Sequence, residues 1–260
     1  MNNNLIYKLR RNRFIRLCYF PFSFFVNLIR QIKYTRSSDS TFVYGLKNKY
    51  EGKRCFIIGN GPSLTLDDLS KLKNEYTFAT NKFYQYYKLI NWKPTFYLSI
   101  DRDVIRNNIS DLISIDNGSN FINIAEKRRF PKNHKSHFIF LKGKFRINRH
   151  GTYQSKVSNE LNKYFSFSEN VVCNCIEFAF YLGFKEIYLI GVDNNYSGNN
   201  NYAKEIHNEI KPDFNYEATL YTYKTLFDYA KKNNILLLNA TRGGKLDCIP
   251  RRTLESVFNE

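Results

Sequence analysis

The sequence predicts an α/β fold with a doubly wound, mostly parallel sheet, and three observations support this fold class. From residue 50 onward, short apolar runs typical of strands alternate with longer segments typical of helices. The first apolar run, residues 55–58, leads directly into a glycine turn. With 260 residues, of which 43% are hydrophobic, the chain is long enough to bury a core in one large domain.

Residues 1–36 form a basic, aromatic segment without any acidic residue. Its apolar run, residues 14–29, is interrupted by Pro21 and too short to span a bilayer, and no small-residue cleavage site follows it. We interpret residues 1–36 as an amphipathic extension bound to an anionic inner leaflet, which predicts a cytoplasmic protein peripheral on the inner membrane. The alternative is a helix packed on the main domain with its charges in solvent.

Residues 37–50 are predicted to be a linker, and residues 51–260 a nucleotide-sugar-binding catalytic domain. Apolar runs bounded by turn residues predict seven strands: residues 55–58, 76–79, 95–100, 120–124, 137–141, 186–190 and 235–239. Helices are predicted at residues 66–72, 104–113, 171–182 and 216–233. The last of these carries an apolar stripe at helical spacing that faces a core.

The charge and the cysteines narrow the functional class. The net charge is +17, but no nucleic-acid-binding motif is present and many aromatic residues lie in core-like apolar runs, so we expect no nucleic-acid partner. Five cysteines without paired spacing argue against a disulfide framework. Cys173 and Cys175 have no second pair or nearby histidine, so no metal is expected there.

The glycine turn is the strongest indication of a ligand site. It reads Gly59, Asn60, Gly61, Pro62, Ser63, directly after the first strand. Glycine permits positive φ and close approach of a ligand, and Ser63 is a candidate N-cap of a helix whose free N–H groups would bind an anion. The turn matches neither the dinucleotide fingerprint nor the P-loop. The alternative is a tight strand-to-helix turn without a ligand.

Polar residues follow other predicted strands at their carboxyl ends, where ligands bind in open α/β sheets. Asn81 follows the second strand, Asp101 and Asp103 the third, and Asp193 the strand at 186–190. Arg242 lies in a second glycine turn after the last strand. The alternative is that each residue only closes a turn or caps a helix.

Three blocks, residues 57–64, 78–84 and 181–193, together resemble the bacterial sialyltransferases of glycosyltransferase family 42. The resemblance implies a single Rossmann-like, GT-A-like domain and inverting transfer from CMP-sialic acid without a metal. It also implies that the glycine turn and Asn81 contact the CMP moiety. Homo-oligomers are a further expectation, because this scaffold often forms them in that family.

The chain also resembles the MptE-like group, which includes 6-hydroxymethylpterin diphosphokinases. The block at 181–193 and the tail at 239–250 carry this second resemblance. Under it, ATP and Mg²⁺ would be needed, and Asp101 and Asp103 could present carboxylates to the ion.

The catalytic residues depart from the sialyltransferase pattern. That family places a histidine before the last long helix, where this chain has Glu217, with His207 in the same region. A near-neutral pKa favours His207 as the base. Tyr196 and Tyr202 lie one residue away from the two tyrosines that meet the departing phosphate in that family. Further donors would be Ser63, Arg149 and Arg242.

The function expected from the sequence is a glycosyltransferase of bacterial lipopolysaccharide or capsule synthesis. It would transfer an acidic, sialic acid-like or Kdo-like sugar from a CMP-sugar donor to a glycan or glycolipid acceptor, and it would need no cofactor because the CMP-sugar is a substrate. Two alternatives stay open: a diphosphokinase or other phosphotransferase that uses ATP and Mg²⁺, and a non-catalytic nucleotide-binding partner in glycan assembly.

Overall fold

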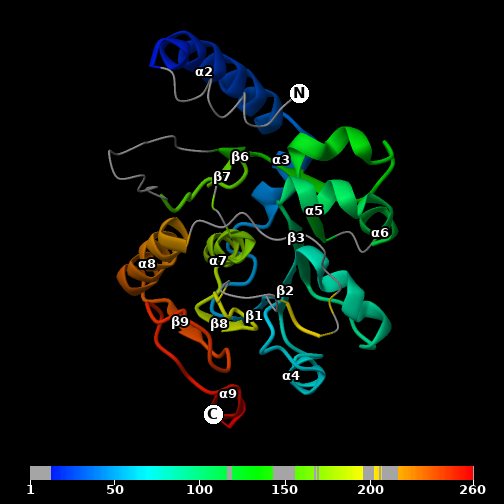
Figure 1. The fold of residues 1–260 in the computed structure, drawn as a ribbon, viewed down its shortest axis with the longest axis vertical. Helices are drawn as coiled ribbons and strands as arrows, with labels where there is room; N and C mark the ends of the chain where they lie inside the picture. The colour runs from blue at the N-terminus through cyan, green and yellow to red at the C-terminus, as the bar shows by residue number, and fades with distance from the viewer. Residues whose placement is uncertain are drawn as a thin grey trace.

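A seven-stranded parallel sheet forms the centre of the fold (Figure 1). The computed structural model describes residues 13–115, 119–142, 156–166, 168, 170–195, 202–204, 206 and 216–259, and for residues 13–23 only the backbone is considered. The strand order is β5–β4–β3–β2–β1–β8–β9, and all of these pairings are parallel. The strands are β1 (Arg54–Ile58), β2 (Thr77–Thr80), β3 (Phe96–Ser99), β4 (Asn120–Asn123), β5 (His137–Ile139), β8 (Glu186–Ile190) and β9 (Leu236–Asn239). All seven predicted strands are confirmed.

Helices cover both faces of this sheet, which explains why its strands are continuous apolar runs and not alternating ones. In β1, Cys55 and Ile57 pack into a core with α7 (Val171–Leu182) and α8 (Tyr216–Lys232). Phe56 and Ile58 pack into a second core on the opposite face. That core includes residues of α4 (Leu66–Lys71), η1 (Asn81–Lys88), α5 (Arg102–Asn107), α6 (Ile109–Ser114) and α9 (Leu254–Phe258). The doubly wound α/β prediction is therefore confirmed.

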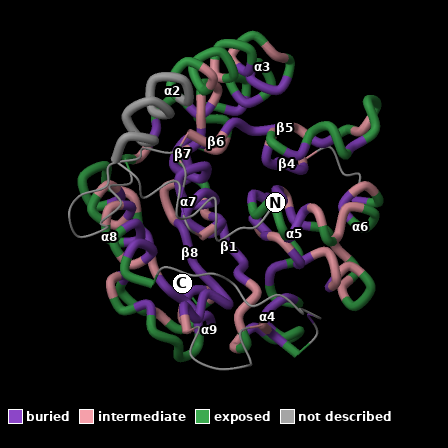
Figure 2. The backbone as a smooth tube through the Cα atoms, turned by 45° about the horizontal axis from the view of Figure 1, so that its top comes forward, coloured by how far each residue is buried: buried purple, intermediate pink, exposed green. Residues whose placement is uncertain are grey.

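Helix α7 is buried along its whole length, at the centre of the molecule in Figure 2. The Asn170 side chain caps its N-terminus by accepting a hydrogen bond from the Val172 N–H, and Gly183 ends it with φ 92°. The Phe178 ring of α7 lies within 6.0 Å, centroid to centroid, of four other aromatic rings of the core. These rings are Phe78, Phe96, Phe121 and Phe165. Predicted as residues 171–182, α7 is confirmed in full.

The segment predicted as a linker, residues 37–50, is instead packed structure. It contains α3 (Ser38–Gly45), capped by the Ser37 side chain. The buried Asp39 carboxylate accepts a hydrogen bond from Lys127 Nζ at 2.7 Å, and Val43 and Leu46 join the core. These tertiary contacts override a polar composition that resembles a linker. Before α3 lies α2 (Arg13–Thr35), so part of residues 1–36 is a helix.

The predicted helix at residues 104–113 is divided into α5 and α6. The break lies at Asn108, whose side-chain Nδ2 donates to the Val104 carbonyl at 2.7 Å and competes with the helical hydrogen bonds. The remaining elements are η2 (Ile124–Arg129) and the two-stranded pair β6 (Leu141–Lys142) and β7 (Phe165–Ser166).

The buried Glu177 of α7 holds the segment before α7 in place. Its carboxylate oxygens accept hydrogen bonds from the backbone N–H groups of Ser158 at 2.7 Å and Ser166 at 3.0 Å. Burial raises the pKa of Glu177 to about 7, in spite of these hydrogen bonds. The buried Glu177 side chain thus connects α7 to residues 156–166 through these two hydrogen bonds.

Candidate nucleotide site

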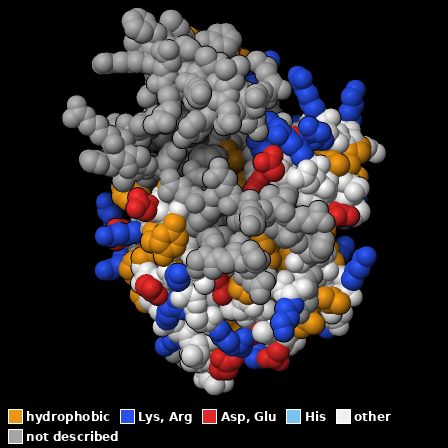
Figure 3. Space-filling view, viewed as in Figure 1, with side chains coloured by type: hydrophobic (Ala, Val, Ile, Leu, Met, Phe, Trp, Pro, Cys, Tyr) orange, Lys and Arg blue, Asp and Glu red, His pale blue; other side chains and the backbone are white. Residues whose placement is uncertain are grey.

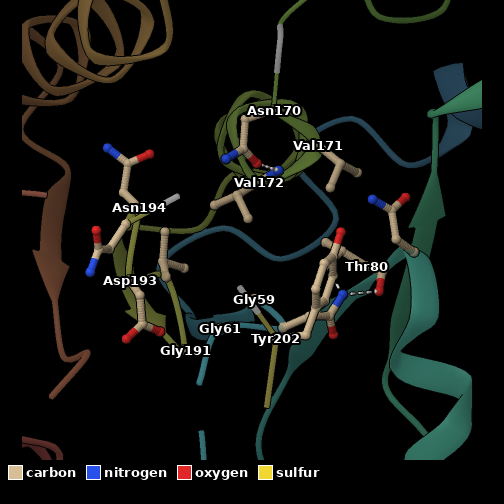
Figure 4. Close-up of a pocket in the computed structure, with 14 residues that line it drawn as sticks. Gly59, Gly61, Thr80, Asn170, Val171, Val172, Gly191, Asp193, Asn194 and Tyr202 are labelled. Carbon is tan, nitrogen blue, oxygen red and sulfur yellow. Dashed lines mark hydrogen bonds between the residues drawn. The ribbon is translucent and has the colours of Figure 1, made fainter. Parts of the chain in front are cut away.

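A pocket opens at the point where the strand order of the sheet reverses. From β1 the chain adds β2, β3, β4 and β5 on one side, and then returns to add β8 and β9 on the other. Open α/β sheets bind ligands at the carboxyl ends of the strands beside such a reversal. The pocket is lined by residues that follow β1, β2 and β8 (Figure 4). Its empty volume, including the part open to solvent, is about 530 Å³.

The two glycines after β1 are required by the loop after β8. Gly59 N–H donates to the Ile190 carbonyl and Gly61 N–H to the Gly191 carbonyl, each at 2.8 Å. A Cβ on Gly59 would overlap the Gly191 carbonyl oxygen, and a Cβ on Gly61 would overlap Asp193 Oδ2. Neither glycine has a positive φ. The predicted positive φ is therefore wrong, and what requires the two glycines in this structure is the close approach of the loop after β8.

Asp193 is the centre of the contact between these loops. Its Oδ2 accepts a hydrogen bond from Ser63 Oγ at 2.8 Å, and its carbonyl accepts one from Lys245 N–H at 2.7 Å. Burial raises the pKa of the Asp193 carboxyl group, which the hydrogen bonds from Ser63 only partly offset. Ser63 is therefore a partner of Asp193 and not a helix cap. Thr65 is the N-cap of α4 instead, in a capping box with Asp68.

Carboxamide side chains supply much of the polar lining. Asn60 Nδ2 donates to the Thr80 carbonyl at 2.9 Å, and its Oδ1 is buried without a hydrogen-bond partner in the described part of the chain. Asn81 adopts φ 45°, and its Oδ1 accepts from Ser99 Oγ at 3.4 Å. Asn194 is only 4% exposed, and neither of its amide atoms has a hydrogen-bond partner among the described residues. Buried polar atoms normally have a hydrogen-bond partner. The Asn60 Oδ1 and the Asn194 amide atoms have none among the described residues, so they are available to hydrogen-bond a ligand.

The N-terminus of α7 forms one wall of the pocket. Asn170, Val171 and Val172 line it, at the end where a twelve-residue helix carries a partial positive charge. Anions bind at such helix termini. The sequence placed the anion-binding terminus after Ser63, but the helix there, α4, has only six residues and its own capping box. The prediction that Ser63 caps this helix is therefore wrong, and the helix whose N-terminus lines the pocket is α7.

Tyr202 is the predicted phosphate-contacting residue that the structure does bring to the pocket. Its ring stands between Gly59 and Thr80 in Figure 4. Burial raises the pKa of Tyr202, and the Asp101 carboxylate raises it further. The phenol therefore stays protonated and can donate a hydrogen bond into the pocket.

A family model described as 6-hydroxymethylpterin diphosphokinase MptE-like matches residues 26–199. The chain belongs to this MptE-like family. A search of curated proteins found no significant match.

A comparison with solved structures found two glycosyltransferases that are similar to this MptE-like chain. One is the MAf glycosyltransferase from Magnetospirillum magneticum AMB-1, with 13% identity and a TM-score of 0.47. The match covers 87% of this chain but only 39% of that protein, so the chain spans about two fifths of its length. The other is the sialyltransferase CstII from Campylobacter jejuni in complex with cytidine-5'-monophosphate, with 17% identity, a TM-score of 0.43 and coverage of 77% and 85%.

Several residues predicted for the site do not line the pocket of this MptE-like fold. Arg242 makes two hydrogen bonds of 2.6 Å to the Asp68 carboxylate and lies 3.2 Å from Glu255, so it fixes α4 to α9. Asp101 caps α5 by accepting hydrogen bonds from the N–H groups of Asp103 and Val104. Pro62 is exposed and does not line the pocket.

The predicted catalytic residues are only partly located. Glu217 is exposed in the first turn of α8 and does not line the pocket. His207, Tyr196 and Arg149 lie outside the described residues. Asn194, which the sequence reasoning missed, follows Asp193 at the same strand end, so the strand-end rule could have included it.

Proposed function

We propose that this MptE-like protein is a glycosyltransferase that uses a CMP-activated acidic sugar and inverts the anomeric centre. The observation that supports this best is the composition of the pocket at the reversal of the strand order. Carboxamides and a phenol face the partly positive N-terminus of α7, and the one carboxylate among the described lining residues, Asp193, already accepts from Ser63. Such a lining suits a ligand that carries hydroxyl groups and negative charge.

Each part of the pocket has a role in this reaction. The α7 N-terminus and the Tyr202 hydroxyl would stabilise the charge that develops on the departing cytidine monophosphate or on the sugar carboxylate. Asn60, Asn81 and Asn194 would hold the nucleoside and sugar by hydrogen bonds. We propose His207 as the base that takes the acceptor proton, with Glu217 as the second candidate, because an imidazole titrates near neutral pH. The product would be a surface glycan such as lipopolysaccharide or capsule.

The family match favours a second candidate, an ATP- and Mg²⁺-dependent diphosphokinase. Its proposed carboxylates are engaged elsewhere, since Asp101 caps α5 and Asp103 lies 3.5 Å from Arg106 Nη1. Within the described ranges, no group of three His, Cys, Asp or Glu side chains could hold a metal ion. Asp101 and Asp103 would have to exchange these contacts for Mg²⁺, and we derive no metal-dependent step from them.

Calorimetry with CMP, CDP, UDP, GDP and ATP, each with and without Mg²⁺, separates the two candidates. We expect CMP to bind without added metal. Replacing Asn194 by alanine should weaken CMP binding about tenfold, or roughly 1.4 kcal/mol, because the ligand loses a buried hydrogen-bonding partner. The matched control is Asn27→Ala on the exposed surface of α2, which should leave the affinity unchanged. Binding of ATP only, and only with Mg²⁺, would contradict the proposal in favour of the diphosphokinase.

We further propose that α2 docks on the inner leaflet of the membrane. Near its end, the buried Tyr34 ring stacks on Phe140 and fixes α2 to the domain. The opposite side exposes an apolar stripe of about 140° at 100° per residue, formed by Phe24, Phe25, Leu28, Ile29 and Ile32. Lys33 lies at one border of the stripe, next to Ile29 on the helix surface, as expected for an interfacial helix on anionic lipid, whereas Arg30 lies on the opposite side of α2. No helix in the described ranges is long and apolar enough to cross a bilayer.

Co-sedimentation with lipid vesicles tests this docking. The protein should bind vesicles that contain phosphatidylglycerol more strongly than pure phosphatidylcholine, and Phe25→Ser with Ile29→Ser should reduce that binding at least tenfold. The control is Leu89→Ser with Leu236→Ser, two exposed leucines away from α2. Undiminished vesicle binding by the α2 variant would overturn the docking. So would light scattering that shows the stripe to be buried between two copies of the protein.

A further inference from the structure

We propose that Arg102 and Arg129 form a binding site for an oxyanion, a phosphate or carboxylate group, beside the nucleotide pocket. The site is built around Glu126 of η2, whose carboxylate is only 3% exposed. Three guanidinium groups converge on it. Arg102 Nε lies 2.7 Å from Oε1, Arg106 Nη2 lies 2.9 Å from Oε1, and Arg129 Nε lies 2.7 Å from Oε2.

The carboxylate stays charged in this cluster. Burial alone would raise the pKa of Glu126, but the hydrogen bonds from Arg106, Arg102 and Arg129 lower it to about 2. The second carboxylate nearby is Asp103, which lies 3.5 Å from Arg106 Nη1. Within the ion pairs of this cluster, three guanidinium groups meet two carboxylates, Glu126 and Asp103, so the paired groups carry one more positive than negative charge.

The Nη donor groups of Arg102 and Arg129 indicate that the cluster binds an oxyanion. Arg102 and Arg129 each contact Glu126 through Nε alone, and their Nη atoms have no partner among the described residues. Their side chains are 53% and 51% exposed. The two Nη groups of an arginine can bind a phosphate or carboxylate group bidentately. Because Nε is anchored on a buried carboxylate, these two guanidinium groups are held in place before any ligand arrives.

The cluster lies at the same edge of the sheet as the pocket. Arg102 begins α5, directly after β3, and η2 directly follows β4, so both lie at the carboxyl ends of strands. Asp101, the neighbour of Arg102, acts electrostatically on the pocket residue Tyr202. Lys and Arg side chains gather at the upper right of the space-filling view, in the region of α5 and η2 (Figure 3). The oxyanion is therefore a group on a substrate that reaches the pocket from this side.

Under the proposed glycosyltransferase function, on which this part of the inference rests, that substrate is the acceptor. Its phosphate or carboxylate would bind Arg102 and Arg129 and direct the reacting hydroxyl toward the donor pocket. The site thus narrows the acceptor from any glycan to one that carries an anionic group near the reacting hydroxyl.

Titration of the full chain with inorganic phosphate and with glucuronate, followed by calorimetry or NMR, tests the site itself. We expect millimolar binding of at least one probe. The double variant Arg102→Lys with Arg129→Lys should weaken it at least fivefold, because lysine keeps the charge toward Glu126 but loses the bidentate geometry. The relative response to phosphate and glucuronate identifies the group that the site prefers.

Matched measurements distinguish this site from the pocket. Arg128→Gln, in the same segment but outside the cluster, should leave probe binding unchanged. CMP affinity and the melting temperature of the double variant should stay near the wild-type values. Wild-type protein that binds CMP but neither probe would overturn the oxyanion site and leave the proposed function standing. Probe binding without CMP binding would support the site and contradict the proposed function. Equal probe binding by the double variant and wild type would show that the cluster serves only to hold η2 to α5.

Discussion

Replacing Phe178 by alanine is expected to lower the free energy of unfolding by about 3–5 kcal/mol, the range typical of large aromatic truncations in a core. The Phe178 ring is fully buried and contacts four other aromatic rings, with centroid separations from 4.8 to 6.0 Å. Alanine would leave a cavity between α7 and the sheet that these rings cannot fill without moving the strands. Urea denaturation followed by circular dichroism measures the change.

Two further variants make the prediction specific. Phe178→Leu retains part of the buried apolar volume and should cost less than half as much. Phe25→Ala removes the same ring from a position that is 61% exposed on α2, and should change the stability by less than about 0.5 kcal/mol. A loss below 1 kcal/mol for Phe178→Ala would contradict the central position assigned to α7.

Gly59→Ala is expected to reduce both stability and nucleotide binding. The added Cβ would overlap the Gly191 carbonyl oxygen and lie 2.9 Å from the Gly191 carbonyl carbon, so the backbone after β8 would have to move. Overpacking of this kind costs roughly 1–3 kcal/mol, and we expect the upper end because the neighbouring atoms belong to the backbone. The loops after β1 and β8 would separate, and the pocket between them would lose its shape. Thermal unfolding and CMP calorimetry measure the two effects.

Gly45 provides the matched control for this substitution. It ends α3, has no positive φ, and a Cβ there would meet nothing within 4 Å. Gly45→Ala should leave CMP binding unchanged and stabilise the protein by up to about 1 kcal/mol. If Gly59→Ala behaved in the same way as Gly45→Ala, the tight contact between the two loops would be refuted.

The sheet could be predicted from the sequence because its strands are buried on both faces and stand out as apolar runs. α3 could not be predicted in this way. Its stability comes from distant partners, such as the Lys127 ammonium group on Asp39 and the Asn162 carbonyl that accepts from Ser40 Oγ. The sequence pattern of residues 37–50 alone therefore does not reveal these contacts.

From the sequence, only those residues of the site that directly follow a strand could be predicted. Gly59, Asn81 and Asp193 follow strands, and the structure places all three at the pocket. The role of the α7 N-terminus depends on where the chain crosses back to pair β8 with β1, which sequence spacing does not reveal. Arg242 was misassigned for a related reason, since its partner Asp68 is 174 positions away in the chain.

The hydrogen bond between Ser63 and Asp193 joins residues 130 positions apart, and β1 lies directly beside β8 in the sheet. Two of the segments that line the pocket therefore come from opposite ends of a long excursion of the chain. Contacts of such high sequence separation form slowly, because the loop between them must close first. A folding intermediate that contains β1 to β5 alone would have no pocket. Recovery of ligand binding during refolding would then follow the docking of β8, and it would lag behind the return of the helical signal.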